Sequence, residues 1–139
     1  MKYIVYNKIS EFAKDLVWNG LKIHNDQFAV RNQMDFTVCA IEDETIIGVG
    51  MGESKYDWLI LRYLWVEEKR QKNGIGTNIL KEIEKLASER NLLGIHLDTF
   101  EFQAKEFYVK NGFSIFGEIN NHPIGYKRYF MKKQIKINE

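Results

Sequence analysis

The chain has 139 residues, a net charge of +1 and a hydrophobic share of 45%, which suit a single domain (1–139) with a buried core. This charge balance gives no electrostatic reason to expect a nucleic acid, an anionic membrane or a strongly acidic partner. No run approaches the roughly 20 apolar residues of a membrane helix, and the start of the chain turns polar too soon for a signal peptide, so we expect a cytoplasmic protein.

The hydrophobic pattern alternates between strand and helix periods along the whole chain. Ser10 is a candidate N-cap for a first helix that runs to about His24. Residues 25–34 are polar and irregular and fit neither period. In chain order, we expect a strand at 3–6, a helix at 10–24, strands at 35–42, 45–56 and 58–66, a helix at 77–90, a strand at 92–99, a short helix at 103–111, and a hairpin of 113–119 and 126–135.

Three glycines, Gly48, Gly50 and Gly52, stand two apart in the strand expected at 45–56. Residues two apart in a strand face the same side, so these glycines leave a bare face that another element can approach closely. We expect a packed helix at this face rather than a ligand. The triplet is not a nucleotide fingerprint, because Glu53 interrupts the glycine pattern.

Cysteine and histidine are too sparse for a metal centre. The single cysteine, Cys39, excludes an internal disulfide and a cysteine-cluster metal site, and in an apolar strand we expect it to be a small core residue. His24, His96 and His122 lie far apart and show no metal-ligand spacing. We therefore expect no metal.

The stretch from 58 to 90 joins an apolar strand, a glycine loop and a helix. The strand Trp58–Val66 is apolar on both faces and should lie in the middle of a sheet. Gly74 and Gly76 permit close approach of a ligand to the backbone, and the free N–H groups at the start of the following helix attract an anion. This combination predicts an anion site, although a simple tight turn would have the same residues.

Two common phosphate-binding loops do not fit this stretch. A P-loop needs a lysine followed by Ser or Thr after its second glycine, and none follows Gly76. A dinucleotide fingerprint needs a third glycine where Ile79 stands.

The pattern Gln71-x-x-Gly74-x-Gly76 resembles the (Q/R)-x-x-G-x-(G/A) acyl-CoA pyrophosphate loop of the GCN5-related N-acetyltransferases, the GNAT family. A second family motif, A-x-x-(F/L)-Y-x-K-x-G-F, is matched about 30 residues later. The matching residues are Ala104, Phe107, Tyr108, Lys110, Gly112 and Phe113. The resemblance covers roughly residues 45–133, and the run through His122-Pro123 is similar to one bacterial subgroup of small acetyltransferases.

The resemblance implies an α/β fold with a mixed, mostly antiparallel twisted sheet, two central parallel strands that splay apart, and helices on both faces. It also implies an N-acetyltransferase in which a primary amine attacks acetyl-CoA directly in a ternary complex. Tyr108 would be the general acid, protonated at neutral pH because tyrosine has a pKa of about 10. The Val66 N–H would polarise the thioester carbonyl, and Lys110 would reach the adenosine phosphates. The remaining acetyl-CoA contacts would come from Leu64, Trp65, Gln71, Lys72, Asn73, Gly74, Ile75, Gly76 and Thr77.

Several alternatives remain open from the sequence. Tyr108 could merely pack beside Phe107, and Lys110 could be a solvated helix lysine. The chain could be a catalytically idle acyl-CoA sensor or a nucleotide-binding regulatory domain, although Tyr108 at the motif position favours an enzyme. The acceptor could be a small-molecule amine or the amine of a peptide or protein, and the enzyme could be a homodimer. The general base is unassigned among water and the carboxylates of Glu67, Glu68, Asp98 and Glu101; Glu101 stands where many family members have an asparagine.

Overall fold

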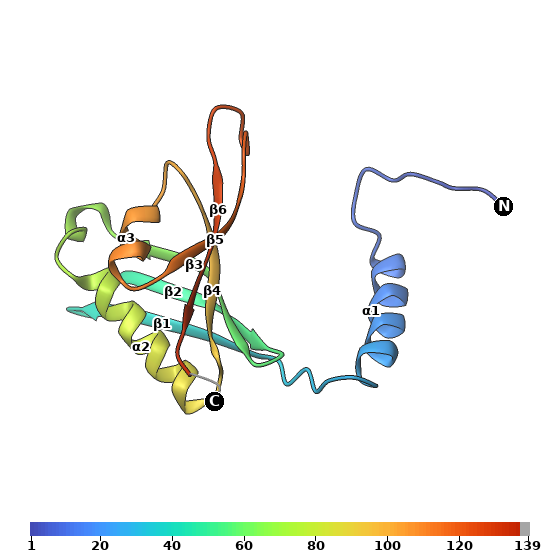
Figure 1. Ribbon diagram of the computed structural model, residues 1–139, viewed down its shortest axis with the longest axis horizontal. Helices are drawn as coiled ribbons and strands as arrows, with labels where there is room; N and C mark the ends of the chain where they lie inside the picture. The colour runs from blue at the N-terminus through green and yellow to red at the C-terminus, as the bar shows by residue number, and fades with distance from the viewer. Residues whose placement is uncertain (137–139) are drawn as a thin grey trace. The chain divides into compact units, whose positions relative to one another are not determined.

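A computed structural model describes residues 1–136, and the chain forms two compact units, Met1–Arg31 and the part from Asn32 onward (Figure 1). The first unit contains helix α1 (Glu11–Asn25), whose N-cap Ser10 accepts a hydrogen bond from the Ala13 N–H at 3.2 Å, as predicted. No residue of α1 is buried. The strand predicted at 3–6 was wrong. A strand needs a hydrogen-bonded neighbour, and the rest of this unit consists of helix, turn and irregular chain.

The second unit is built on a six-stranded sheet with the order β1-β2-β3-β4-β6-β5. Only the central pair, β3 and β4, is parallel, which confirms the mixed, mostly antiparallel sheet. The elements are β1 (Met34–Glu42), β2 (Thr45–Lys55), β3 (Trp58–Val66), η1 (Glu68–Arg70), α2 (Ile75–Glu89), β4 (Gly94–Phe100), α3 (Lys105–Lys110), β5 (Ser114–Ile119) and β6 (Arg128–Gln134). Among residues 1–136, no helix has the length and apolar character needed to cross a membrane.

The two parallel strands separate after a short paired stretch. Their ladder joins only 58–60 of β3 to 94–96 of β4. In the ladder with β2, Met51 faces Tyr63 and Gly52 faces Leu61, so Arg62 is an extra residue in β3. Such a bulge bends a strand and increases its twist. The remainder of β3 is therefore free to diverge from β4, as the splayed strands require.

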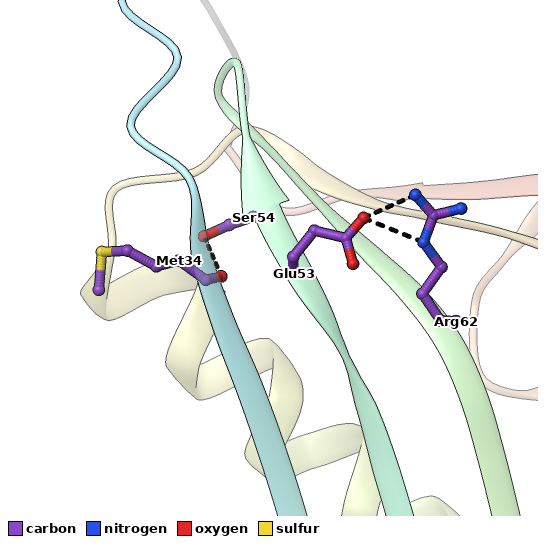
Figure 2. A network of polar contacts seen from close by, with 4 residues as sticks. All are labelled: Met34, Glu53, Ser54 and Arg62. Atoms are coloured by element: carbon purple, nitrogen blue, oxygen red, sulfur yellow. Dashed lines mark hydrogen bonds and ion pairs between the residues drawn. The ribbon is translucent and has the colours of Figure 1, made fainter. Parts of the chain in front are cut away.

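The neighbouring strand β2 has a glycine, Gly52, opposite the bulge. A Cβ atom at Gly52 would lie 1.9 Å from the Ile60 carbonyl oxygen, so only glycine fits there. The next residue, Glu53, accepts two hydrogen bonds from the Arg62 guanidinium, at 2.6 and 3.0 Å (Figure 2). Beyond it, the Ser54 hydroxyl donates to the Met34 carbonyl of β1 at 3.4 Å. These contacts tie β1, β2 and β3 together beside the bulge.

Helix α2 packs on one face of the sheet (Figure 1). Cβ atoms at Gly48 and Gly50 would lie within 3 Å of the side chains of Ile79 and Ile83 of α2, so these two glycines admit a helix, as predicted. The same prediction was wrong for Gly52, whose neighbour is the backbone of β3. The core between helix and sheet includes the fully buried side chains of Leu59, Leu80, Ile83, Ile95 and Met131.

Cys39 is exposed, so its prediction as a core residue was wrong. It lies in β1, which is an edge strand of the sheet. Phe36, Val38 and Ala40 of this strand pack against the core beneath α2. Because side chains alternate between the two faces of a strand, Cys39 lies on the other face.

Candidate functional site

The diverging part of β3 leaves backbone groups without a strand partner. The Glu67 N–H donates to the Ile47 carbonyl of β2 at 2.8 Å, and Val66 lies opposite Gly48 in the next register position. Hydrogen-bonded and non-hydrogen-bonded pairs alternate in an antiparallel ladder. The N–H and C=O groups of Val66 and Leu64 therefore point away from β2, toward the side that β4 has left. An extended ligand with amide groups can pair with this edge.

Trp65 lies between Leu64 and Val66, so its backbone N–H and C=O groups point the opposite way, toward β2. Its side chain is 54% exposed and is the part of Trp65 that a ligand could contact. The Gln71 side chain donates through Nε2 to the Val66 carbonyl at 3.2 Å. This bond anchors the loop to the end of β3 and leaves the Val66 N–H available.

The glycine loop leads into α2 in a conformation that exposes backbone donors. Lys72 and Gly74 have positive φ angles of 68° and 82°, and Gly74 is the N-cap of α2. Among residues 1–136 no side chain caps this helix start, so the N–H groups of Ile75, Gly76 and Thr77 keep their hydrogen-bonding capacity and the positive end of the helix dipole. Asn73 is exposed beside them. The loop can bind a phosphate-like anion through its backbone.

Helix α3 lies directly against this loop. A Cβ atom at Gly76 would lie 3.0 Å from the ring of Phe107, so the small residue allows the two helices to approach. The next residue along α3 is Tyr108. The packing of Phe107 on Gly76 therefore places the tyrosine near the loop from Gln71 to Thr77, which we call the anion loop.

Tyr108 is buried, with 7% of the residue exposed. Its ring packs against those of Phe107 and Phe113, with centroid distances of 5.3 and 5.6 Å. Burial, aided by the negative charge of Asp98, raises the pKa of Tyr108 to about 12, so its hydroxyl is protonated at neutral pH. Within residues 1–136 this hydroxyl has no hydrogen-bond partner, and it is not sealed from solvent. The ring packs in the core, while the hydroxyl remains available as a proton donor.

The four carboxylates considered as bases have different surroundings. Asp98 accepts one hydrogen bond on Oδ1 from the Arg128 Nε at 3.1 Å and forms an ion pair with the same guanidinium at 2.9 Å, and its negative charge acts on Tyr108. Glu101 accepts from the buried Tyr129 hydroxyl at 3.4 Å. The other two lie at the entrance to the loop: Glu67 is 3.8 Å from Arg70, and Glu68 is exposed in η1.

Lys110 is exposed in the last turn of α3, and its side chain forms no ion pair with any residue in the described part of the chain. One further polar residue, His96, was not singled out from the sequence. It is half-buried, faces Ile60 in the last β3–β4 pair and lines a cavity. Its position two residues before Asp98 in one strand was the signal, because both then lie on the same face of β4.

No group of three or more His, Cys, Asp or Glu side chains between residues 1 and 136 is arranged to hold a metal ion. The donors at this site are backbone N–H groups and one tyrosine hydroxyl. Such donors suit a phosphate-containing ligand with an extended amide arm.

Comparisons with known proteins agree with this geometry. The profile of the acetyltransferase (GNAT) family matches residues 6–113. Blasticidin-S acetyltransferase of Streptomyces morookaense is 27% identical over 86 residues, which are 61% of this chain and 63% of that protein; the match thus spans less than two thirds of that relative.

Two solved structures have the same fold. The crystal structure of an acetyltransferase from Bacillus cereus superposes with a TM-score of 0.85 and 27% identity, covering 94% of this chain and 97% of the other. An aminoglycoside 6'-N-acetyltransferase complexed with coenzyme A superposes with a TM-score of 0.69 and 20% identity, covering 96% and 97% of the two chains. At that identity, the second likeness concerns the fold alone.

Proposed function

The chain belongs to the acetyltransferase (GNAT) family, whose enzymes use acetyl-CoA, and from this premise we propose that it moves the acetyl group to a primary amine by direct attack in a ternary complex. The observation that carries the proposal is the Tyr108 hydroxyl: it is protonated, has no partner among the described residues, and belongs to a helix packed on the anion loop. A protein that only bound acyl-CoA would have no need of this donor.

The donor would be held by backbone groups. The pantetheine arm would pair with Leu64 and Val66, whose N–H and C=O groups face the gap between β3 and β4. The pyrophosphate would accept hydrogen bonds from the loop between Gln71 and Thr77 and from the start of α2. Such fixed donors place the thioester beside the acceptor, and positioning is itself a large part of catalysis.

Acyl transfer also needs stabilisation of negative charge and movement of two protons. The Val66 N–H would donate to the thioester oxygen as it gains charge. Tyr108 would give its proton to the leaving thiolate. The attacking amine must lose a proton, and of the four candidate carboxylates Asp98 is best placed, because it lies on β4 beside the gap and interacts with Tyr108. Direct transfer and transfer through water are both compatible with this position.

We propose that the acceptor is a small-molecule amine and that the whole chain acts as one acetyltransferase domain. The first point is supported by the relative named for an antibiotic substrate, blasticidin-S acetyltransferase. The second is supported by the B. cereus structure, which this chain matches over nearly the full length of both.

The test is release of CoA thiol from acetyl-CoA across a panel of amines, with acetyl-CoA binding measured on the same preparation. We expect release that requires a particular amine and that drops in Tyr108→Phe while acetyl-CoA still binds. Acetyl-CoA binding without release, for small amines and peptide amines alike, would instead identify an idle acyl-CoA sensor.

A further inference from the structure

A cavity of about 370 Å³ lies over the paired stretch of β3 and β4, next to the turn between β2 and β3. Ile60 and His96, the last residues of the two strands to pair, both line it. The neighbours of Ile60 in sequence, Leu59 and Leu61, are buried in the core that includes α2. Because side chains alternate along a strand, the cavity lies on the opposite face of the sheet.

The walls of this cavity are largely aromatic. The Trp58 ring lies 6.1 Å from that of His96 at an angle of 56°. Gly94 leaves room for the indole, because a Cβ atom there would lie 2.6 Å from it. On the next two strands of the sheet, β6 and β5, the Lys132 ammonium lies 5.6 Å from the centre of the Phe116 ring. A flat apolar group can pack between such walls.

The charged groups of the cavity are cationic. Lys55 and Lys132 line it, and neither forms an ion pair with another residue between positions 32 and 136. The nearby carboxylate of Glu53 is occupied by Arg62. Asp98, further along β4, is occupied by Arg128.

His96 does not alter this charge balance at neutral pH. Burial, and then the charge of Arg62, hold the pKa of its imidazole below the usual range, so the ring is neutral. The groups that act on His96 are Arg62, Asp98, Lys55 and Glu53, and Lys132 lies opposite it on β6. Two lysines therefore remain uncompensated, and the cavity attracts an anion.

Resting on the proposed acetyl transfer, we infer that this cavity binds the acceptor and that the acceptor is an amine with an aromatic body and a carboxylate at its far end. The carboxylate would meet Lys55 and Lys132, and the ring would pack between Trp58 and Phe116. From His96, residues on this face of β4 lead to Asp98, about 7 Å further along the strand. An acceptor anchored by its acid end could therefore extend its amine toward Asp98 and Tyr108.

The first experiment compares two matched probes, 4-(aminomethyl)benzoate and benzylamine, which differ only in the carboxylate. Binding is measured by titration calorimetry on the full chain without acetyl-CoA. We expect the carboxylate to tighten binding roughly tenfold, and Lys132→Gln or Lys55→Gln to lose roughly threefold to fivefold each, as for partly exposed ion pairs. Lys81→Gln, an exposed lysine of α2 outside the cavity, is the matched control and should bind both probes as the wild type does.

Equal binding of the two probes, or no detectable binding of either at the solubility limit, would overturn the inference. The result of this binding experiment can be told apart from the result of the acetyl-transfer test. If other amines are acetylated while the two probes bind equally, the acceptor class is wrong and acetyl transfer stands. If the carboxylate probe binds through the two lysines while no amine releases thiol from bound acetyl-CoA, the cavity stands and the proposed function fails. Where the carboxylate probe is acetylated, the two lysine variants should raise KM and leave kcat unchanged.

Discussion

Ile60 lies opposite His96 in the last pair of the parallel ladder between β3 and β4. Two residues further along β3, Arg62 forms the bulge that bends the strand away. The sheet is therefore closed before this point and open after it. The gap between the diverging strands and the cavity therefore both reach this pair of residues.

Replacing Gly52 should disturb the register of β2 on β3. In Gly52→Ala the new methyl group would meet the Ile60 carbonyl at 1.9 Å, and backbone cannot move aside as a flexible side chain can. We expect a loss of roughly 1–3 kcal/mol in the free energy of unfolding, measured in urea, and weaker acetyl-CoA binding by calorimetry. Gly20→Ala is the control: its position in α1 is open, so stability should hold or rise by about 0.5–1 kcal/mol. Wild-type behaviour of Gly52→Ala would mean that the bulge tolerates a side chain.

The role of the loop from Gln71 to Thr77 in anion binding can be tested by comparing a glycine of the loop with a control glycine outside it. Gly74 and Gly125 have φ angles of 82° and 90°, and a side chain at either would meet open space. Gly74→Val and Gly125→Val should therefore lose similar stability, about 1–2 kcal/mol. We expect only Gly74→Val to weaken acetyl-CoA binding, because only that side chain would stand against the pyrophosphate. Equal affinities in the two variants would remove the loop from the binding site.

The sequence predicted the central parts of this fold because their signals are local. The ends of β3 were placed correctly, since a turn precedes Trp58 and charged residues follow Val66. The cap at Ser10 also follows from a short-range rule. The strand expected at 3–6 failed because its formation depends on a distant partner, which no local pattern reveals.

In the candidate site, too, features that depend on local motifs were predicted, and features that depend on the alignment of distant elements were not. The loop at Gly74 and the helix of Tyr108 were predicted from motifs, and the structure packs their elements together through Gly76 and Phe107. The bulge at Arg62 was not predictable, because it is a shift in register between two strands. The cavity at His96 was equally hidden, since its lining comes from several elements whose alignment is a tertiary property.

Removing the Tyr108 hydroxyl should affect turnover and leave donor binding intact. In Tyr108→Phe the ring packing with Phe107 and Phe113 remains, while the proton for the leaving thiolate is lost. We expect kcat to fall roughly 100-fold or more, with unchanged acetyl-CoA affinity. Tyr129→Phe is a control of similar burial whose hydroxyl contacts Glu101. Equal losses in the two variants would show that Tyr108 has no special role.

Tyr108 should also resist deprotonation. Its pKa is raised to about 12 from the ordinary value of 10.0 by burial and by Asp98. The folded state therefore holds this proton more tightly than the unfolded chain, and the resulting stability is complete below pH 10 and lost as the pH rises toward 12. Absorbance of the phenolate should show one tyrosine titrating late in the wild type and missing in Tyr108→Phe. A late tyrosine that persists in the variant would assign the shift to another residue.

His96 should make stability depend on pH in the acidic range. Its pKa is lowered from 6.5, first by burial and then by Arg62, so the unfolded chain binds the proton more readily than the folded protein. Stability is then complete above about pH 6.5 and declines as the pH falls from there toward the folded-state pKa. Urea unfolding between about pH 7.5 and pH 5 should show a steeper decline for the wild type than for His96→Gln, which cannot take up the proton. The difference between the two curves isolates His96, because the other titrating groups are common to both proteins. Parallel curves would mean that the imidazole is as easily protonated in the folded protein as in water.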